Sequence, residues 1–387
     1  MKGTAEGTDL RKRQEMDEGK EQKKTKAGRP AGWVLAGGAF AGMALGLLWL
    51  ADVKSGFAQW YTLHVYTKLS GAAGVLFGQI PFSVSEFLLY SAAVVLIFCF
   101  VRLVCRCAAC RGKKAAGLLA AFGARVFCGL CALFLVYALT CGINYHRTSF
   151  AEETGLSLEG GTEQELERVC RILTEEVNER AGKVQRNQQG VMTLTCHVPS
   201  EAVKAMEGLG ENYACLSGSY PQPKGLMFSW ILSVQKLTGI YSPFTIEANY
   251  NTDMTDYNIP FTACHELAHL RGFMQEEEAN FIGFLAGVCS ENSDFQYSSY
   301  LMGWIYCTNA LYETDVDIYR QIRQELSGEV SADLEANSRF WEQYDSPVAE
   351  VADQVNDSYL KANGQEDGVA SYDRIVELIL SYYRRQD

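Results

Sequence analysis

The chain has 387 residues and a formal net charge of −12, which is enough length for two or three domains. The charge is unevenly placed. Residues 1–143 contain 17 Lys/Arg and 8 Asp/Glu, a balance of +9, whereas residues 144–387 contain 17 Lys/Arg and 38 Asp/Glu, a balance of −21. This asymmetry indicates two different environments. The acidic, aromatic-rich second half excludes nucleic acid as an expected partner.

The first part of the chain alternates charged and apolar segments. Residues 1–31 are rich in Gly and Lys and nearly free of large apolar side chains, which predicts a disordered tail. Three apolar runs follow, and each is long enough to cross a bilayer as a helix, the second when it is extended to Cys105: 33–50, 87–101 and 126–143. We therefore predict a three-helix transmembrane region over residues 32–143.

The basic residues between these runs predict their orientation. The tail before the first run and the loop between the second and third runs are rich in Lys and Arg, whereas the loop 52–86 carries only Lys54 and Lys68. Loops with an excess of Lys and Arg stay in the cytoplasm. The tail is therefore expected to be cytoplasmic, and residues 144–387 are expected to form an extracytoplasmic domain.

Helix signals dominate this outer domain. Thr162 and Glu165 form a capping box ahead of an amphipathic segment. Pro260 can open another helix, because the first turn does not need its missing N–H. Further helices are expected at 199–209, at 228–239 with Gly239 as its end, and through most of the chain after residue 298.

One segment of the outer domain has the composition of a β-strand. Residues 240–251 are rich in β-branched and aromatic side chains around Pro243, which predicts a short edge strand. The fold class is then a mainly α membrane protein, with three N-terminal transmembrane helices and a mostly helical outer domain that contains a small β-sheet. The 13 cysteines leave open whether the outer domain has disulfides or free buried thiols.

The stretch FTACHELAHLRGF contains the strongest chemical signal. His265 and His269 lie four residues apart, so both imidazoles project from one face of a helix. This spacing provides two nitrogen ligands for one Zn²⁺, and Glu266 between them can reach a water on the metal without binding the metal itself. The His-Glu-x-x-His pattern is typical of metal-dependent hydrolases in which the glutamate is the general base. We predict one zinc ion, with Glu266 as the catalytic residue.

A third protein ligand has to come from outside this helical turn, because a catalytic zinc takes three protein ligands and leaves a fourth position open. Gly272 follows His269 by three residues and can end the helix in a left-handed conformation. The next segment would then return toward the metal. Residue 275 is glutamine and not a third histidine. The candidates are the consecutive carboxylates Glu276, Glu277 and Glu278.

This acidic segment resembles the third-ligand segment of the gluzincin metalloproteases. There the first glutamate binds zinc, and an aspartate four residues later supports a ligand. The resemblance implies Glu276 as the third zinc ligand. It also implies Asn280, in the place of the aspartate, as a hydrogen-bond partner of a ligand imidazole, with Gly272 as the supporting turn. The outer domain would then be zincin-like.

A longer series of segments is similar to one family. FGQIPFSVSEFLLY, GIYSPFTIEANYN, IPFTACHELAHLRGF, EEEANF and YSSYL occur in the order found in DUF3810, an uncharacterised bacterial family of multi-pass membrane proteins with a zinc-peptidase-like motif. The resemblance covers roughly residues 33–380. It implies a membrane-anchored metallopeptidase but no substrate.

Related zinc peptidases have an edge strand before the motif helix that pairs with the substrate backbone. By this resemblance, residues 244–250 would bind an extended peptide by β-augmentation, with Phe244, Glu247 and Tyr250 as substrate-binding residues. An internal strand or loop with packing aromatics is the alternative. Hydrolysis also needs a hydrogen-bond donor for the tetrahedral oxyanion. The candidates are Tyr241, Tyr250, Tyr257, Tyr297 and His197.

These observations together predict a membrane-anchored zinc metallopeptidase that hydrolyses peptide bonds in a peptide or protein near the membrane surface. Its partners are the lipid bilayer and the substrate. The alternatives are a non-catalytic, metal-stabilised sensor or assembly module and an amide hydrolase acting on cell-wall peptides. The expected domains are a disordered cytoplasmic tail (1–31), a transmembrane region (32–143) and an extracytoplasmic zinc metallopeptidase-like domain (144–387).

Overall fold

The computed structural model describes residues 30–110, 112–158, 160–363, 365 and 372–386. The disorder expected over 1–31 therefore lies outside the described residues, apart from the last two positions, which already belong to the first helix. The structure is 72% helical and contains one small open sheet of three strands. This confirms the prediction of a mainly α protein with a small sheet.

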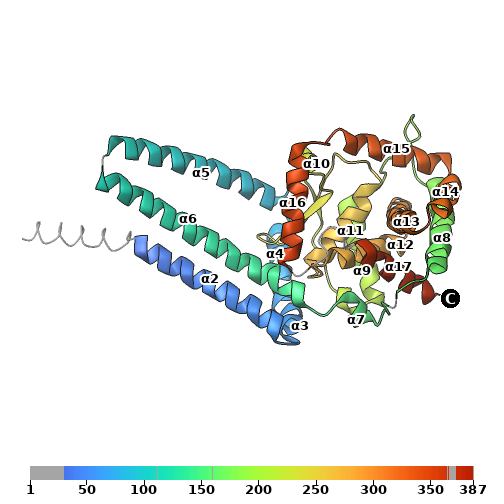
Figure 1. The fold of residues 1–387 in the computed structure, drawn as a ribbon, viewed down its shortest axis with the longest axis horizontal. Helices are drawn as coiled ribbons and strands as arrows, with labels where there is room; N and C mark the ends of the chain where they lie inside the picture. The colour runs from blue at the N-terminus through green and yellow to red at the C-terminus, as the bar shows by residue number, and fades with distance from the viewer. Residues whose placement is uncertain (1–29, 111, 159, 364, 366–371, 387) are drawn as a thin grey trace, which may run out of the picture. The chain divides into compact units, whose positions relative to one another are not determined.

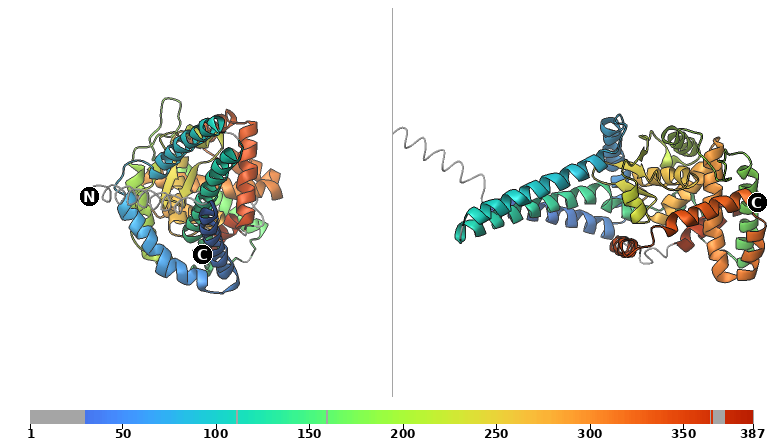
Figure 2. Two further views of the ribbon diagram at one scale, coloured as in Figure 1. Left: turned by 90° about the vertical axis from the view of Figure 1, so that its left-hand side faces the viewer. Right: turned by 90° about the horizontal axis from the view of Figure 1, so that it is seen from above.

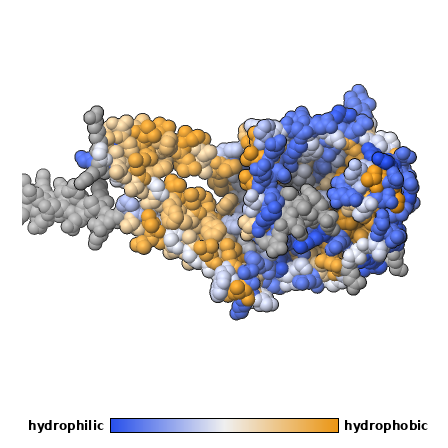
Figure 3. Space-filling model, viewed as in Figure 1, coloured by the Kyte–Doolittle hydropathy of each residue, from blue (hydrophilic) through white to orange (hydrophobic). Residues whose placement is uncertain are grey.

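The chain divides into two compact units, and the first contains most of three long apolar helices. These are α2 (Pro30–Val53), α5 (Val84–Ala109) and α6 (Lys113–Thr140), shown in Figures 1 and 2. All three are long and apolar enough to cross a membrane, as the apolar runs predict. On the face drawn in Figure 3, hydrophobic residues gather over these helices. α2 and α6 pack closely at Gly37, where an added Cβ would lie 2.8 Å from the ring of Phe127.

The second unit is assembled from two separate parts of the chain, Leu50–Leu88 and Leu139–Asp387. The first part, expected only as a loop between spans, contains α3 (Phe57–Tyr61), the π-helical turn η1 (Thr62–Tyr66) and α4 (Thr67–Phe77). The hydroxyl of Tyr66 joins it to the second part by donating to the carbonyl of Leu270 at 3.0 Å. This segment therefore belongs to the same compact unit as residues 139–387.

Most helices of the second unit lie where their sequence signals predict them. α8 (Glu163–Ala181) begins with the expected capping box of Thr162 and Glu165. The others are η2 (Gly142–His146), α7 (Phe150–Thr154), α9 (Val198–Asn212), η3 (Ala214–Leu216), α10 (Trp230–Val234), α11 (Asn258–Leu270), α12 (Glu276–Val288), α13 (Ser293–Thr314), α14 (Val316–Gln324), α15 (Gly328–Glu342), α16 (Pro347–Ala362) and α17 (Tyr372–Arg384).

The helix predicted over 228–239 is wrong in extent, because α10 ends at Val234. Lys236 adopts a left-handed conformation with φ of 55°, and the N–H of Leu237 returns to the carbonyl of Leu232 at 3.0 Å. This left-handed residue and this hydrogen bond end the helix before Gly239, which instead begins a strand. A lysine in this conformation carries no recognisable stop signal in sequence.

The sheet corrects the expectation of a single edge strand over 240–251. This segment forms a hairpin of β2 (Gly239–Ser242) and β3 (Glu247–Tyr250), and Pro243 lies in the turn between them. β3 is the central strand, since it also pairs in parallel with β1 (Lys224–Gly225). At Asn249 and Tyr250 both edges of β3 are therefore paired within the sheet, which leaves no free edge for a peptide at these two residues.

The helices α11 and α12 lie in the core of the second unit. Nearly all their residues are buried, and α9, α13 and α17 pack around them, with α8 packed against α13 (Figure 1). Gly283 lets the two helices approach closely, because a Cβ there would come within 3.2 Å of the backbone nitrogen of His265. All 13 cysteines are free thiols, which settles the open question of disulfides.

Candidate metal centre

α11 carries His265, Glu266 and His269. The helix begins two residues before Pro260, and the backbone N–H of Phe261 donates to the hydroxyl of Ser298 at 3.0 Å, which satisfies one free N–H of the first turn. The two imidazole rings lie with centroids 4.6 Å apart and nearly perpendicular to one another. The four-residue spacing therefore brings both rings together, as predicted.

A tight turn ends α11 at the predicted glycine. Gly272 has φ of 95°, and its N–H donates to the carbonyl of His269 at 2.9 Å. The N–H of Phe273 donates to the carbonyl of Ala268 at 3.2 Å, which completes a Schellman motif. The left-handed conformation favours glycine, and a Cβ at this position would also lie 3.1 Å from Thr62. The turn reverses the chain so that α12 begins beside the two histidines.

Arg147 braces this turn from the segment that follows α6. Its guanidinium donates to the carbonyl of Arg271 at 3.2 Å and lies 3.7 Å from the ring centroid of Phe273. It also pairs with Glu153 at 2.5 Å. The carbonyl of Arg271 belongs to the helix end, where no intrahelical donor remains. No sequence pattern indicated Arg147, because the two groups that it contacts in the turn, the carbonyl of Arg271 and the ring of Phe273, lie more than 100 residues away.

Glu276 is the first residue of α12 and meets both histidines. Its Oε2 lies 3.4 Å from Nε2 of His265, and its Oε1 lies 3.5 Å from Nε2 of His269. One potential ligand atom from each of the three residues lies within 4.8 Å of the other two, so the group could hold a metal ion. The side chain of Glu276 is 35% exposed, which leaves the group accessible from solvent on that side.

The next two glutamates have other partners. Glu277 accepts from the side-chain amide of Gln365 at 2.7 Å and from Arg374 at 3.2 Å. Glu278 accepts from the backbone N–H of Phe150 at 2.5 Å, at the start of α7. The structure thus separates the three consecutive acids, and only Glu276 joins the histidines.

The Nδ1 atoms of the two imidazoles, which point away from Glu276, have different surroundings. Nδ1 of His269 donates to the carbonyl of Phe273 at 2.8 Å, so the turn after α11 orients the ring with Nε2 toward Glu276. Sequence reasoning missed this partner, because a backbone carbonyl leaves no signal in residue identity. Asn280 interacts with the side chain of His265 and acts to raise its pKa. Nδ1 of His265 has no hydrogen-bond partner of ordinary geometry among the described residues.

Glu266 is buried beside the group. Its Oε2 has no hydrogen-bond partner among the described residues. The first residue of β2 lies against the same carboxylate, because a Cβ added to Gly239 would be only 2.3 Å from Oε1 of Glu266 and 2.8 Å from Thr262. A buried carboxylate without a hydrogen-bond partner costs free energy unless a cation lies beside it or it is protonated. Such a carboxylate is suited to accept a proton during a reaction.

Burial and the interactions among the four side chains shift the pKa of each of them. Burial lowers the pKa of His265 to about 4. Burial also acts to lower the pKa of His269, but the negative charge of Glu276 outweighs it and raises that pKa to about 9. Burial acts to raise the pKa of Glu276, and the charge of His269 instead lowers it to about 2. Burial raises the pKa of Glu266 to about 8. A nearby cation would lower this last pKa and restore the ionised form that a base requires.

Among the candidate oxyanion donors, Tyr241 lies beside a ligand. Its ring centroid is 6.3 Å from that of His269, and its hydroxyl donates to the carbonyl of Thr140 at 3.1 Å. Its hydroxyl also lies 2.9 Å from that of Tyr66, a residue that sequence reasoning did not select. Burial raises the pKa of both phenols, so both are neutral hydrogen-bond donors.

The other donor candidates have different surroundings. Tyr257 is buried in the core, and the hydroxyl of Tyr297 is bonded to Asp333. His197 is exposed at the start of α9, and its Nδ1 lies 3.0 Å from the hydroxyl of Ser200. No contact of these three residues with the metal ligands is recorded in the described part of the chain.

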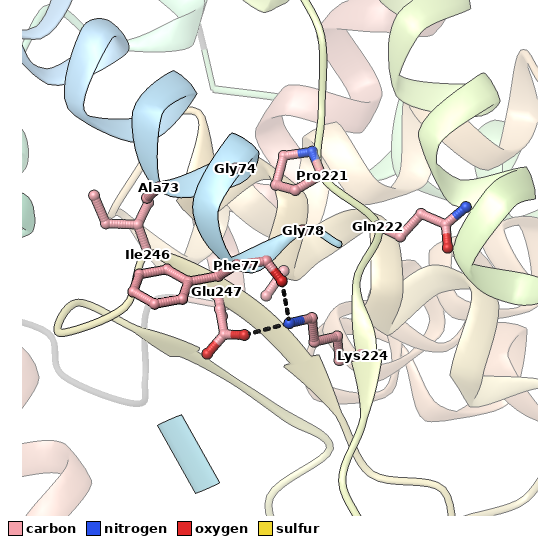
Figure 4. Close-up of a pocket in the computed structure, with 10 residues that line it drawn as sticks. Ala73, Gly74, Phe77, Gly78, Pro221, Gln222, Lys224, Ile246 and Glu247 are labelled. Carbon is pink, nitrogen blue, oxygen red and sulfur yellow. Dashed lines mark hydrogen bonds and ion pairs between the residues drawn. The ribbon is translucent and has the colours of Figure 1, made fainter. Parts of the chain in front are cut away.

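Two of the three residues expected to bind substrate are buried in the sheet. Phe244 is exposed in the turn of the hairpin, and Tyr250 is buried in β3. Glu247 is buried and pairs with Lys224 at 2.5 Å (Figure 4). Its carboxylate also accepts from the backbone N–H groups of Val84 and Ser85 at the start of α5. The carboxylate of Glu247 therefore binds Lys224 and the start of an apolar helix, and among the described residues none of its hydrogen bonds goes to His265, His269 or Glu276.

Fold and site together define a mainly helical protein with three apolar helices and a His-His-Glu group able to hold a metal ion. A family model described as "Protein of unknown function (DUF3810)" matches residues 61–380. The chain therefore belongs to this family, as the resemblance predicted. The matched region includes Tyr66 as well as the three ligand residues. No curated protein and no solved structure matches the chain.

Proposed function

We propose that this protein is a membrane-anchored zinc metallopeptidase in which Glu266 is the general base. The observation that carries the proposal is the meeting of His265, His269 and Glu276, three residues from two helices, with the buried carboxylate of Glu266 in the same helical turn. Two imidazoles and one carboxylate are a ligand set of catalytic zinc sites. A structural site would be expected to have four protein ligands and no need for Glu266.

The spacing of the ligand atoms supports zinc. In a tetrahedral site with bonds of about 2.0–2.1 Å, neighbouring ligand atoms are about 3.3–3.4 Å apart. Nε2 of His265 lies 3.4 Å from Oε2 of Glu276 and Nε2 of His269 lies 3.5 Å from Oε1, so each carboxylate oxygen approaches one imidazole at close to this spacing. Larger cations that prefer six to eight oxygen ligands, such as Ca²⁺, suit this small, nitrogen-rich group poorly.

The residues of the chain would divide the chemistry between them. Bound zinc would activate a water molecule by lowering its pKa from about 15.7 toward 7. Glu266 would act as the general base, because its Oε2 has no hydrogen-bond partner among the described residues and could take a proton from a water molecule as the oxygen of that water attacks the peptide carbonyl carbon. Glu266 then gives the proton to the amide nitrogen as the C–N bond breaks. Tyr241 would donate to the oxyanion after its hydroxyl rotates away from the carbonyl of Thr140.

The position of β2 suggests how a peptide would approach. β2 pairs with β3 on one side, and the described residues contribute no strand to its other side. Its first residue lies directly against Glu266. A peptide pairing with the free edge of β2 would place a backbone carbonyl near the carboxylate. The docking strand would then be 239–242 and not the predicted 244–250.

The proposal includes a location. The three apolar helices would cross the membrane, with the basic tail in the cytoplasm and the C-terminal unit outside, because basic loops are retained inside. Fusion of alkaline phosphatase or a fluorescent protein to the C-terminus tests this. We expect an active phosphatase and a dark fluorescent protein, and the opposite pair of results would reverse the orientation.

The metal and the reaction are tested separately on the full-length protein. We expect one zinc per chain by elemental mass spectrometry, its loss in His265→Ala, and its retention in the control Glu277→Gln, whose carboxylate lies outside the ligand group. Peptides from a host proteome digest, analysed before and after incubation, should be cleaved by wild type and not by Glu266→Gln. Zinc retained by wild type without cleavage would favour a non-catalytic, metal-stabilised module. Absence of zinc from wild type would refute the zinc centre itself.

A further inference from the structure

The helix α16 presents an apolar face that the described residues leave uncovered. Val348, Val351 and Val355 are 55%, 59% and 64% exposed, and Tyr359 continues the same stripe at intervals of three and four residues. The adjoining face is buried against the unit through Ala349 and Leu360. A continuous apolar stripe of this kind usually marks an interaction surface.

The C-terminal end of α16 lies beside the end of the third apolar helix. The hydroxyl of Tyr359 is 3.5 Å from Sγ of Cys141 and accepts from the hydroxyl of Tyr145 at 3.3 Å. The rings of the two tyrosines pack edge to face, with centroids 6.3 Å apart. Cys141 directly follows the last residue of α6. This end of α16 is therefore held where α6 enters the second unit.

The N-terminal end of α16 is held near the start of the second apolar helix. Asp345, two residues before α16, pairs with Lys236, which follows α10. Just before α10, the backbone N–H groups of Met227 and Phe228 each donate to the carboxylate of Glu86 at 2.9 Å. Glu86 lies in the first turn of α5. The compact segment 227–236 thus connects this end of α16 to the point where α5 leaves the unit.

We propose that α16 lies in the interfacial layer of the bilayer, with its valine face toward the lipid acyl chains. The inference rests on the proposed membrane anchorage. α5 begins and α6 ends in the same unit, so both points lie at one membrane surface if these helices are spans. A helix of 16 residues, about 24 Å long, connects them and runs along that surface.

The surrounding side chains suit a lipid surface. Met227, Phe228 and Trp230 are exposed beside the start of α5, and aromatic side chains are favoured at the depth of lipid headgroups. The acidic residues of α16 lie away from the valine stripe, since Asp353 is about 160° around the helix from Val355. This division between an apolar and a charged face is typical of helices that lie in a membrane interface.

Photo-crosslinking of the full-length protein in native membranes tests the position of α16. A diazirine amino acid would replace Val351 or Val355, and Asp353, exposed on the other side of the helix, provides the matched control. Val95, an exposed residue in the middle of α5, reports whether the apolar helices are in lipid at all. We expect several-fold more lipid adduct at Val351, Val355 and Val95 than at Asp353, measured by mass spectrometry.

The other outcomes of the crosslinking distinguish the position of α16 from the membrane anchorage of the protein. Lipid adducts at Val95 without adducts at Val351 and Val355 would overturn the inference about α16 alone. Adducts to a second copy of the chain or to another protein at Val351 would overturn it as well, because the stripe would then be a protein interface. Absence of lipid adducts at Val95 would instead refute the membrane anchorage on which both proposals depend.

Discussion

Replacement of Lys224 by Met is expected to destabilise the C-terminal unit by about 3–5 kcal/mol, the usual effect of removing one partner of a buried ion pair. Nζ of Lys224 lies 2.5 Å from Oε1 of Glu247, and the two side chains are 7% and 4% exposed. Without the ammonium, the donors to this carboxylate that remain among the described residues are the N–H groups of Val84 at 3.2 Å and Ser85 at 2.8 Å. The carbonyl of Phe77 also loses its bond from Nζ. The remaining buried charge would then have too few partners to offset its desolvation.

Thermal unfolding of the full-length protein in lipid nanodiscs, followed by tryptophan fluorescence, measures this effect. A loss of 3–5 kcal/mol corresponds to a melting temperature lower by roughly 6–20 °C, at about 2–4 °C per kcal/mol for a large domain. The matched control is Lys204→Met, because Lys204 pairs with Glu201 at the surface and is 69% exposed. That variant should lose at most about 1 kcal/mol.

The double variant Lys224→Met/Glu247→Gln tests the cause of the loss. It removes both charges, so it should recover part of the stability that Lys224→Met loses. Equal melting temperatures for Lys224→Met and Lys204→Met would refute the reasoning, because the buried pair would then contribute no more than a surface pair.

Three further changes probe the metal centre and its supports. A chelator should lower the melting temperature of wild type and leave that of His265→Ala/His269→Ala unchanged. The reason is that a metal bound to the native state stabilises it, by about 2.7 kcal/mol when the free metal is at 100 times its Kd. An equal shift in both proteins would contradict metal binding by these histidines. Gly272→Ala should lose about 1–3 kcal/mol of stability, since φ is 95° and its Cβ would crowd Thr62, whereas Gly208→Ala, in an uncrowded position of α9, should gain slightly; equal melting temperatures would count against the strained turn. Gly239→Ala should retain zinc but lose about 10²-fold in turnover, because its Cβ must displace the carboxylate of Glu266; wild-type turnover would contradict the role of Glu266.

Local patterns in the sequence determined much of the metal centre. The four-residue spacing of His265 and His269 is enough to bring two imidazoles to one face, because helix geometry depends on near neighbours alone. The position of Gly272 predicted the turn for the same reason, since a left-handed residue ends a helix locally. The three apolar helices followed from the length and composition of their runs. Glu276 was preferred by family resemblance, and the structure brings its carboxylate to both histidines.

Contacts between distant segments decided the rest, and such contacts leave no periodic trace in sequence. The segment after the first apolar run packs in the C-terminal unit. Hydrogen bonds such as the one from the hydroxyl of Tyr66 to the carbonyl of Leu270, 204 residues away, hold it there. Glu247 looked like a substrate-facing acid, but its partner Lys224 comes from another strand. The backbone carbonyl of Phe273 orients His269, and any residue at position 273 would provide the same carbonyl. The sequence by itself thus determined the two histidines able to bind a metal and the helix that carries them. Only the tertiary structure decided which strand lies beside Glu266 and which segments hold the ligands in place, because those choices depend on packing between elements far apart in the chain.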